Sequence, residues 1–199
     1  MNELNRNYIN GQWVSWAGDM IDVHEAGTGD VIARVPAAGA DETEQAIAAA
    51  DAAFESWSES SLDERIKVLE QLHAGLKERA PEIAETVCRE VGMPIQLATP
   101  IQASAAGCTV VLKPSEIAPQ TAFILAEILD GTDLPKGVFN MVCGYGHTAG
   151  DTLIKHPDVR MVSFTGSTRT GNLIAHAAAD DFKRYALEMG GKSASVILP

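Results

Sequence analysis

Short apolar segments alternate with helical patterns through the second half of this chain, and that alternation constrains its fold more than any other feature. The segments TVVLK, VFNMV and VRMVSF are each followed by a stretch with helical spacing, and RYALE and SASVIL are further strand candidates. A right-handed crossover keeps successive strands pointing the same way, so strands that alternate with helices pair in parallel. We therefore expect an α/β fold, with a parallel sheet from about residue 107 and helices on both of its faces.

The first hundred residues carry a different pattern, in which short strands are followed by helices. The segments YINGQWV, MIDVHE and DVIARVP favour strands, and Asn10 with Gly11 suits a tight hairpin turn. Two later positions fit a capping box, in which a side-chain oxygen accepts a hydrogen bond from a free backbone N–H at a helix start. These two positions are Asp41 with Glu44, and Ser61 with Glu64.

The formal net charge of the chain is -12, and most of its acidic side chains fall in residues 1–100. That half would repel phosphates, which argues against binding of nucleic acid or of an anionic membrane surface. No apolar run approaches the roughly 18 residues that a membrane span needs. The N-terminus MNELNRNYINGQWV lacks the pattern of a signal peptide, so we expect a cytoplasmic protein.

The cysteines and histidines point to neither a disulfide framework nor a metal site. Cys88, Cys108 and Cys143 form an odd set without a C-x-x-C pair. Cys108 lies in AAGCTVV and Cys143 ends VFNMVC, and we expect both to be small buried residues. The five histidines are scattered, with none at metal-ligand spacing from a cysteine or carboxylate, so no metal is expected.

Polar motifs follow the first two predicted strands of the second half. In KPSE, Lys113 and Glu116 could together grip a ribose through its two hydroxyls, or the motif could be a solvated loop. In GYGHTAG, the residues Gly144, Gly146 and Ala149 fit G-x-G-x-x-A. The acidic residue that a dinucleotide fingerprint places about 20 residues later is missing, so a simple tight turn is the alternative.

Two further motifs follow later strands. FTGSTRTG opens a helix directly after a strand, where free N–H groups would attract a phosphate; a plain helix capped by Ser167 is the alternative. In LEMGGK, Glu188 could be a general base in a partly desolvated slot, or an ordinary surface carboxylate. Because parallel strands share the edge at which they end, we expect all four motifs to lie at one edge of one sheet.

Taken together, the motifs resemble the NAD(P)-dependent aldehyde dehydrogenase family. The resemblance is carried, in the family's order, by YINGQWV, ARVPAAGADETEQAIAAADAAFESW, AAGCTVVLKPSE, LPKGVFNMVCGYGHTAG, HPDVRMVSFTGSTRTG and LEMGGKSASVIL. It implies an incomplete aldehyde dehydrogenase fold with a Rossmann-like sheet. Residues 1–102 would supply the N-terminal strands and helices of the cofactor domain, and residues 103–199 its Rossmann-like NAD-binding part.

The resemblance also implies a role for each matching residue. Lys113 and Glu116 would hold the adenosine ribose, with Ser115 beside them, and Gly146 would lie near the adenine. Glu188 would be the general base that activates water to hydrolyse a thioester. The pyrophosphate would face the glycine and hydroxyl residues that open the helix, and the nicotinamide would be bordered by the residues after the base. The residues that would face the pyrophosphate are Gly166, Ser167, Thr168 and Gly171, and those that would border the nicotinamide are Met189 and Gly190.

The sequence departs from the family pattern in two places. The family's nucleophilic cysteine and its oligomerisation strand lie in segments beyond Pro199, and none of the three cysteines here matches the nucleophile. The join near Gln102–Ala105 suggests an internal deletion that removes an oxyanion-stabilising asparagine. We therefore expect a chain that binds cofactor at most, within a family whose intact members oxidise aldehydes and form homo-oligomers. NAD is favoured over NADP, because Glu116 would repel a 2′-phosphate. The alternative is a non-catalytic module that binds a nucleotide or a partner.

Overall fold

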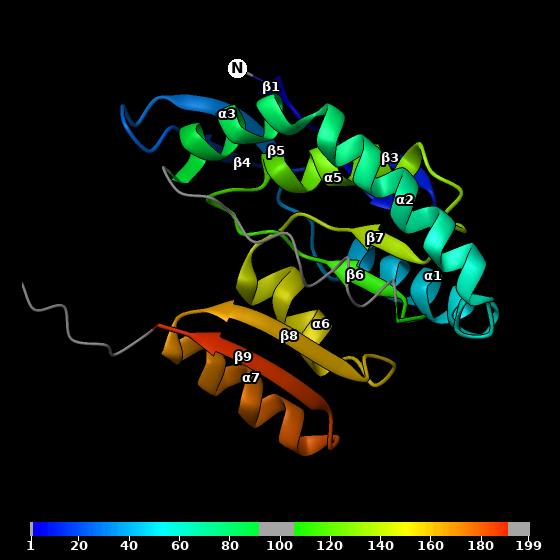
Figure 1. Ribbon diagram of the computed structural model, residues 1–199. Coiled ribbons are helices and arrows are strands. Elements are labelled where there is room, and N and C mark those ends of the chain that lie inside the picture. Colours follow the sequence, from blue (N-terminus) through cyan, green and yellow to red (C-terminus); the bar gives the residue numbers. More distant parts are fainter. Residues whose placement is uncertain (1, 92–105, 191–199) are drawn as a thin grey trace, which may run out of the picture. The chain divides into compact units, whose positions relative to one another are not determined.

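The computed structural model describes residues 2–91 and 106–190 of the chain (Figure 1). The chain divides into two compact units, Met1–Leu153 and Ile154–Pro199. Strands from both sides of residue 102 share one sheet in the first unit. None of the helices in the described ranges is long and apolar enough to cross a membrane.

The N-terminal strands form a three-stranded sheet and a hairpin. In the sheet, ordered β1-β5-β4, β4 pairs antiparallel with β5 and β1 pairs parallel to it. The hairpin turns at Asn10 and Gly11, whose φ angles of 51° and 66° are the left-handed pair that a two-residue turn needs. The strands are β1 (Asn2–Glu3), β2 (Arg6–Ile9), β3 (Gln12–Ser15), β4 (Met20–His24) and β5 (Val31–Pro36).

The hairpin joins two strands from the second half of the chain in a four-stranded sheet, ordered β3-β2-β7-β6. Strands β6 (Val110–Leu112) and β7 (Phe139–Met141) pair in parallel, with Val111 opposite Asn140, which confirms the predicted pairing of TVVLK with VFNMV. On its other side β7 pairs antiparallel with β2, where Tyr8 lies opposite Met141. This four-stranded sheet therefore contains both parallel and antiparallel pairs.

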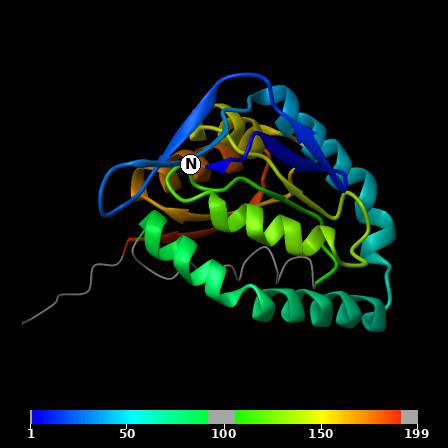
Figure 2. The same ribbon diagram turned by 90° about the horizontal axis from the view of Figure 1, so that it is seen from above.

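Helices cover both faces of this sheet, as expected. On β7, Phe139 and Met141 point into a core with α5, whereas Val142, just beyond the strand, packs with α1 on the other face. Helices α2 and α3 lie alongside α5 (Figure 2). The helices of this unit are α1 (Ala40–Ser58), α2 (Leu62–Glu78), α3 (Ala80–Val91) and α5 (Gln120–Asp130).

One predicted helix start is confirmed and the other is wrong. At α2, Ser61 Oγ accepts from Glu64 N–H at 3.3 Å, and the Glu64 carboxylate accepts from Ser61 N–H at 2.8 Å. Helix α1 begins two residues earlier than Asp41 suggests. Its N-cap is Gly39, which has no side chain to cap the helix, and only half of a capping box is present: the Glu42 carboxylate accepts from Gly39 N–H at 3.1 Å. Two pairs of residues three positions apart occur near this helix start, Gly39 with Glu42 and Asp41 with Glu44, and the helix begins at the earlier pair.

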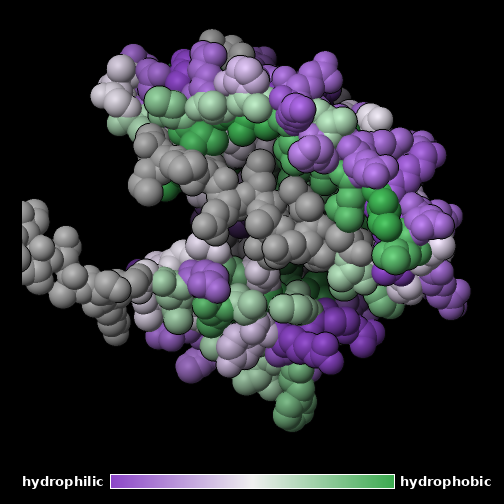
Figure 3. Space-filling model, viewed as in Figure 1, coloured by the Kyte–Doolittle hydropathy of each residue, from purple (hydrophilic) through white to green (hydrophobic). Residues whose placement is uncertain are grey.

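The second unit contains a smaller parallel pair. Strands β8 (Met161–Gly166) and β9 (Arg184–Met189) pair in parallel along their whole length, and α7 (Thr168–Asp180) packs on them. Over this unit, Figure 3 shows hydrophobic patches between hydrophilic ones. Exposed apolar side chains here include Met161, Phe182 and Tyr185.

The single continuous sheet expected from the alternation is not formed within the described ranges. Pairs β6–β7 and β8–β9 belong to separate sheets: β2 pairs with the other side of β7, and no described strand pairs with the other side of β6. A five-residue π-helix, η1 (Gly146–Gly150), and the short helix α6 (Asp151–Lys155) connect the two pairs along the chain. The predicted strand SASVIL lies outside the described residues.

Candidate functional site

Strand β6 delivers Lys113 to its carboxyl end, where the side chain bridges two loops. Its Nζ donates to the carbonyl oxygen of Pro114 at 2.8 Å and to that of Gly144 at 3.0 Å. The Lys113 side chain is 17% exposed, so its ammonium is held in place while one side stays accessible. The interaction ties the turn after β6 to the turn after β7.

Glu116 completes this junction. Its Oε1 accepts from the backbone N–H of Gly146 at 2.7 Å and lies 3.4 Å from Lys113 Nζ. The KPSE and GYGHTAG motifs therefore meet, as their places after neighbouring parallel strands predict. Fixing Oε1 on two donors also fixes the plane of the carboxylate, which is one-third exposed.

Gly144 is needed where the turn after β7 passes the start of α1. A Cβ at Gly144 would lie 2.5 Å from the Ala38 carbonyl oxygen and 2.8 Å from the Cβ of Ala149. Such distances are far below contact, so the turn closes only with glycine. Gly146 is less crowded, since its Cβ would meet Glu116 Oε1 at 3.9 Å.

Two neighbouring side chains shape the surface of this junction. The rings of Tyr145 and His147 stack, with centroids 5.3 Å apart and planes inclined by 20°. Ser115 Oγ accepts from Ile117 N–H at 3.3 Å and thus bends the turn that carries Glu116. Sequence reasoning singled out Ser115 but missed the aromatic pair, whose signal is the two ring residues either side of Gly146.

At the end of β8 the plain capping arrangement is present. Ser167 Oγ accepts from Thr170 N–H at 3.2 Å, and α7 follows from Thr168. A Cβ at Gly171 would lie 2.5 Å from the sulfur of Met189, a contact that the exposed and flexible Met189 side chain could relieve by shifting. Ser167 thus satisfies one of the helix N–H groups that a phosphate would otherwise bind.

Glu188 lies beside this helix start, at the end of β9. It is opposite Thr165 in the parallel pair, and Met189 is opposite Gly166; Gly190 follows the strand. Glu188 is exposed, so the partly desolvated slot expected for a general base is not formed by the described residues. The third and fourth motifs therefore meet each other within the second unit.

The cysteines differ from expectation at one position. Cys143 is buried as predicted, and burial raises the pKa of its thiol to about 12, which keeps it protonated. Cys108 is exposed, so the expectation that it is buried is wrong. The reason is that β6 starts only at Val110 and has β7 as its one described neighbour, which leaves the residues before it at a sheet edge.

Two buried polar residues hold this architecture and were missed by sequence reasoning. Asn7 Oδ1 accepts from the Cys143 N–H at 2.9 Å and so fixes the residue before Gly144. In the second unit, the Lys183 side chain is 2% exposed and donates to the carbonyl oxygens of Ile154 at 3.1 Å and His156 at 2.6 Å. The sequence gives no signal for either residue, since Asn7 follows Arg6 in a polar segment and Lys183 lies before β9.

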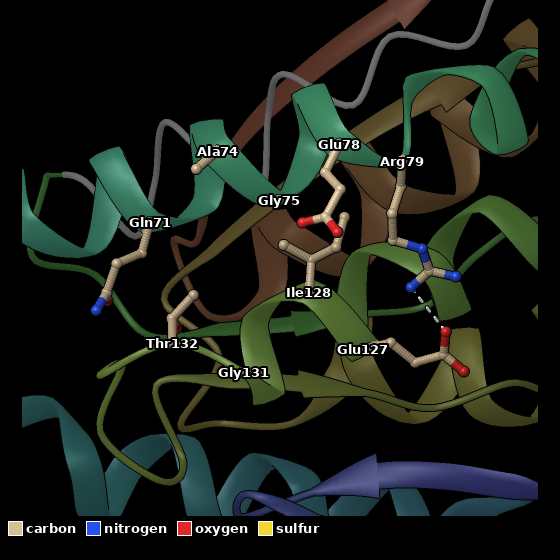
Figure 4. A pocket seen from close by; sticks show the side chains of 9 residues that line it. All are labelled: Gln71, Ala74, Gly75, Glu78, Arg79, Glu127, Ile128, Gly131 and Thr132. Atoms are coloured by element: carbon tan, nitrogen blue, oxygen red, sulfur yellow. Dashed lines mark hydrogen bonds and ion pairs between the residues drawn. The ribbon is translucent and has the colours of Figure 1, made fainter.

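A separate cavity of about 450 Å³ lies between α2 and α5 (Figure 4). Its polar side chains are partly neutralised, since Arg79 donates to Glu127 at 2.8 Å and also binds Glu82. None of the predicted site residues lines it. The lining residues are Gln71, Ala74, Gly75, Glu78, Arg79, Glu127, Ile128, Gly131 and Thr132.

Comparison with known sequences gives a consistent set of relatives. The model of the "Aldehyde dehydrogenase family" matches residues 13–100 and 98–199. A 3-succinoylsemialdehyde-pyridine dehydrogenase from a Pseudomonas species is 36% identical over 256 residues, which cover 100% of this chain and 54% of that protein. A putative aldehyde dehydrogenase from Staphylococcus epidermidis is 34% identical, with the same two shares.

The chain spans about half the length of the curated relatives that it matches. The match to the Pseudomonas protein extends over more positions than this chain has residues, so the matched half of that protein contains positions without a counterpart here. The two segments of the family match meet at residues 98–100. The join expected near Gln102–Ala105 lies outside the described residues.

Solved structures give the same picture of the fold. An aldehyde dehydrogenase from Bartonella henselae superposes with a TM-score of 0.91 at 31% identity, covering 98% of this chain and 54% of that one. A mutant of aldehyde dehydrogenase C from Pseudomonas syringae, crystallised with NAD+ and octanal, has a TM-score of 0.90 at 32% identity, covering 98% of this chain and 52% of that one.

Proposed function

The chain belongs to the aldehyde dehydrogenase family, and from this premise we propose that it binds NAD at the junction of Lys113, Glu116 and Gly146. In the family reaction an aldehyde is oxidised to a carboxylic acid, and NAD, when bound, accepts the hydride. The proposal assigns to this chain the nucleotide-binding part of that reaction.

The observation that carries the proposal is the convergence of Lys113 and Glu116 at the end of two parallel strands. An adenosine ribose presents two adjacent hydroxyls, which a carboxylate and an ammonium can bind together. Oε1 of Glu116 is oriented by Gly146 N–H, which directs the second oxygen of the carboxylate. Neither Gly146 nor Gly150 carries a side chain that would crowd the approach, so the residues present fit the ribose.

NAD is the preferred dinucleotide in this proposal. A 2′-phosphate on the ribose would bring negative charge against the Glu116 carboxylate. Like charges about 4 Å apart repel by about 1 kcal/mol even in bulk water, and by more in a partly desolvated groove. Arg169, which could offset the repulsion, is exposed on the first turn of α7.

The motifs of the second unit carry separate proposals, which rest on the family resemblance. We assign the pyrophosphate to the start of α7, at Gly166, Ser167, Thr168 and Gly171. We assign the nicotinamide to the border formed by Met189 and Gly190. Glu188 would hold the proton of the water that hydrolyses the acyl intermediate in the intact enzyme.

We further propose that the 199-residue chain does not oxidise aldehydes by itself. A nucleophilic cysteine must ionise next to groups that stabilise the transition state. The Cys143 thiol is buried with a raised pKa, which opposes ionisation. Purified chain incubated with NAD and a panel of short and aromatic aldehydes should form no NADH above the buffer control; NADH formation that disappears in Glu188→Gln would overturn this part.

Nucleotide binding is tested by titrating the chain with NADH and NADPH and following the nucleotide fluorescence. We expect saturable NADH binding, weaker NADPH binding, and about tenfold weaker NADH binding by Glu116→Gln, which loses a charge-assisted acceptor. Glu85→Gln, at an exposed carboxylate of α3 outside the proposed site, is the matched control and should bind NADH like the wild type. Equal affinity of the wild type and Glu116→Gln would refute the ribose assignment.

A further inference from the structure

A buried carboxylate stands behind the nucleotide turn, outside the residues assigned so far. Glu90, near the end of α3, is 1% exposed and ranks among the largest fully buried side chains. Its Oε1 accepts from the backbone N–H of Gln120 at 2.8 Å. Burial raises the pKa of this carboxyl, and hydrogen bonds from Gln120 and Thr121 partly offset that rise.

Helix α5 depends on this carboxylate because it lacks a cap of its own. Its N-cap position is Pro119, which offers no side-chain acceptor, and its first turn contains no acidic residue. The Pro119 carbonyl accepts from Ala122 N–H at 3.0 Å and from Phe123 N–H at 3.4 Å. The N–H group of Gln120 is then satisfied from outside the helix, by Glu90 Oε1, while Oε2 of the same carboxylate is buried with no hydrogen-bond partner among the described residues.

The start of α5 is tied to the nucleotide turn by a very short connection. Only Ile117, Ala118 and Pro119 separate Glu116 from Gln120. The body of α5 is fixed in turn, because most of its side chains are buried in the main core. A shift of the first turn of α5 therefore displaces Glu116 relative to Gly146.

We propose that Glu90 is a positioning residue for the nucleotide turn: by capping α5 from α3, it holds Glu116 against the N–H of Gly146. The consequence for nucleotide affinity rests on the proposed function. The effect on the position of Glu116 is independent of that function, because hydrogen exchange at the Gly146 amide measures it directly. This amide donates to Glu116, 30 residues away in sequence, so its hydrogen-exchange rate should report whether Glu116 stays in place.

The test measures residue-resolved amide hydrogen exchange of the full chain in Glu90→Ala, Glu90→Gln and Ser61→Ala. We expect Glu90→Ala to exchange about tenfold faster at Gln120, Thr121 and also Gly146, in line with the loss of a helix cap. Glu90→Gln keeps an acceptor oxygen and should restore most of this protection. Ser61→Ala removes a comparable cap from α2 and should leave Gly146 unchanged.

A wild-type experiment keeps the proposal testable if Glu90→Ala fails to fold. In a series of low urea concentrations, the Gln120 and Gly146 amides should lose protection together, with the same dependence on urea. Separate opening of the two amides, or an unchanged Gly146 in a folded Glu90→Ala variant, would overturn the positioning role. NADH titration of the same variants then reports on the nucleotide: absence of binding by the wild type would refute the proposed function while leaving the exchange result intact.

Discussion

Glu116 and Glu188 are both carboxylates near the end of a parallel strand, yet the chain surrounds them differently. Glu116 is held by Gly146 N–H and Lys113, groups that come from either side of α5 in the sequence. Glu188 lies exposed on a two-stranded pair with α7 as its packed helix. The contrast follows from what covers the strands: β6, which precedes Glu116, is half-buried beside the fully buried β7, whereas β9, which contains Glu188, is exposed at every position but Leu187.

The difference shows what a strand end needs before it can define a site. In the first unit, helices packed on both faces fix the position of β7. Hydrogen bonds between the turns after β6 and β7 fix those turns relative to each other. In the second unit, one face of the pair carries α7, so the described residues set the backbone of Glu188 but not an environment for its carboxylate. The ribose end of the predicted site is therefore preformed within this chain to a greater degree than the catalytic end.

The largest expected effect separates the cores of the two units. Phe139→Ala empties a site that is 2% exposed and should cost about 3–5 kcal/mol in the free energy of unfolding. Leu187→Ala, at a half-buried position of β9, should cost about 1 kcal/mol. Urea unfolding followed by tryptophan fluorescence measures the first loss, because all three tryptophans lie in Met1–Leu153. Hydrogen exchange of the β9 amides measures the loss caused by Leu187→Ala. Equal losses of unfolding free energy in the two variants would contradict the difference between the two cores.

A second prediction compares two glycines, Gly144 in the turn after β7 and Gly190 after β9. Gly144→Ala forces a Cβ into contact with Ala38 and Ala149, so we expect a loss of about 2 kcal/mol together with weaker NADH binding. Gly190→Ala is the matched control, because a Cβ there meets nothing within 4 Å. Thermal unfolding of both variants at one protein concentration decides the matter. A Gly144→Ala variant as stable as Gly190→Ala would show that the turn after β7 is looser than described.

Lowering the pH below about 5 should reduce the thermal stability of the first unit. Hydrogen bonds from Ser61 lower the pKa of Glu64, and those from Arg79 lower the pKa of Glu82. A lowered pKa in the folded state contributes stability that is present above the ordinary value of 4.5 and is lost as the pH falls below it. The unfolding temperature reported by tryptophan fluorescence should therefore fall between pH 5 and about pH 3. Glu64→Gln should show a shallower decline, and an identical decline would exclude Glu64 as a contributor.

The smallest expected effect is at Glu188. Its substitution by glutamine should change the free energy of unfolding by less than about 0.5 kcal/mol, as is usual for exposed positions without a defined partner. Glu116→Gln should cost more, about 1 kcal/mol, because Gly146 and Lys113 lose a charged partner. Paired urea titrations resolve the difference. A larger loss for Glu188→Gln would mean that this carboxylate is held more firmly than its exposure indicates.

Local features of the sequence predicted local structure well. The Ser61 cap, the Asn10–Gly11 turn and the parallel pairs are each set by residues a few positions apart or by the strand–helix alternation. The junction of Lys113 with Gly146 was also predictable, because neighbouring parallel strands end at the same edge.

Long-range pairing was not predictable in the same way. Nothing in YINGQWV indicates that Tyr8 will lie opposite Met141, and this antiparallel pairing makes the four-stranded sheet mixed. The burial of Glu90 was hidden because a carboxylate near a helix end is normally solvated. Only the missing cap of α5, visible as Pro119 before an apolar helix, could have suggested an acceptor from elsewhere.

The insertion of the N-terminal hairpin beside β7 has a consequence for how the protein is made. Strands β2 and β3 are complete by residue 15, but their neighbour is synthesised only at Phe139–Met141. At roughly 5–20 residues per second, the nascent hairpin waits on the order of 10 s for its partner strand. During that time the apolar side chains of Tyr8 and Ile9, buried in the finished protein, are open to a chaperone, a contact that crosslinking of stalled ribosomes would capture until residue 141 has left the exit tunnel.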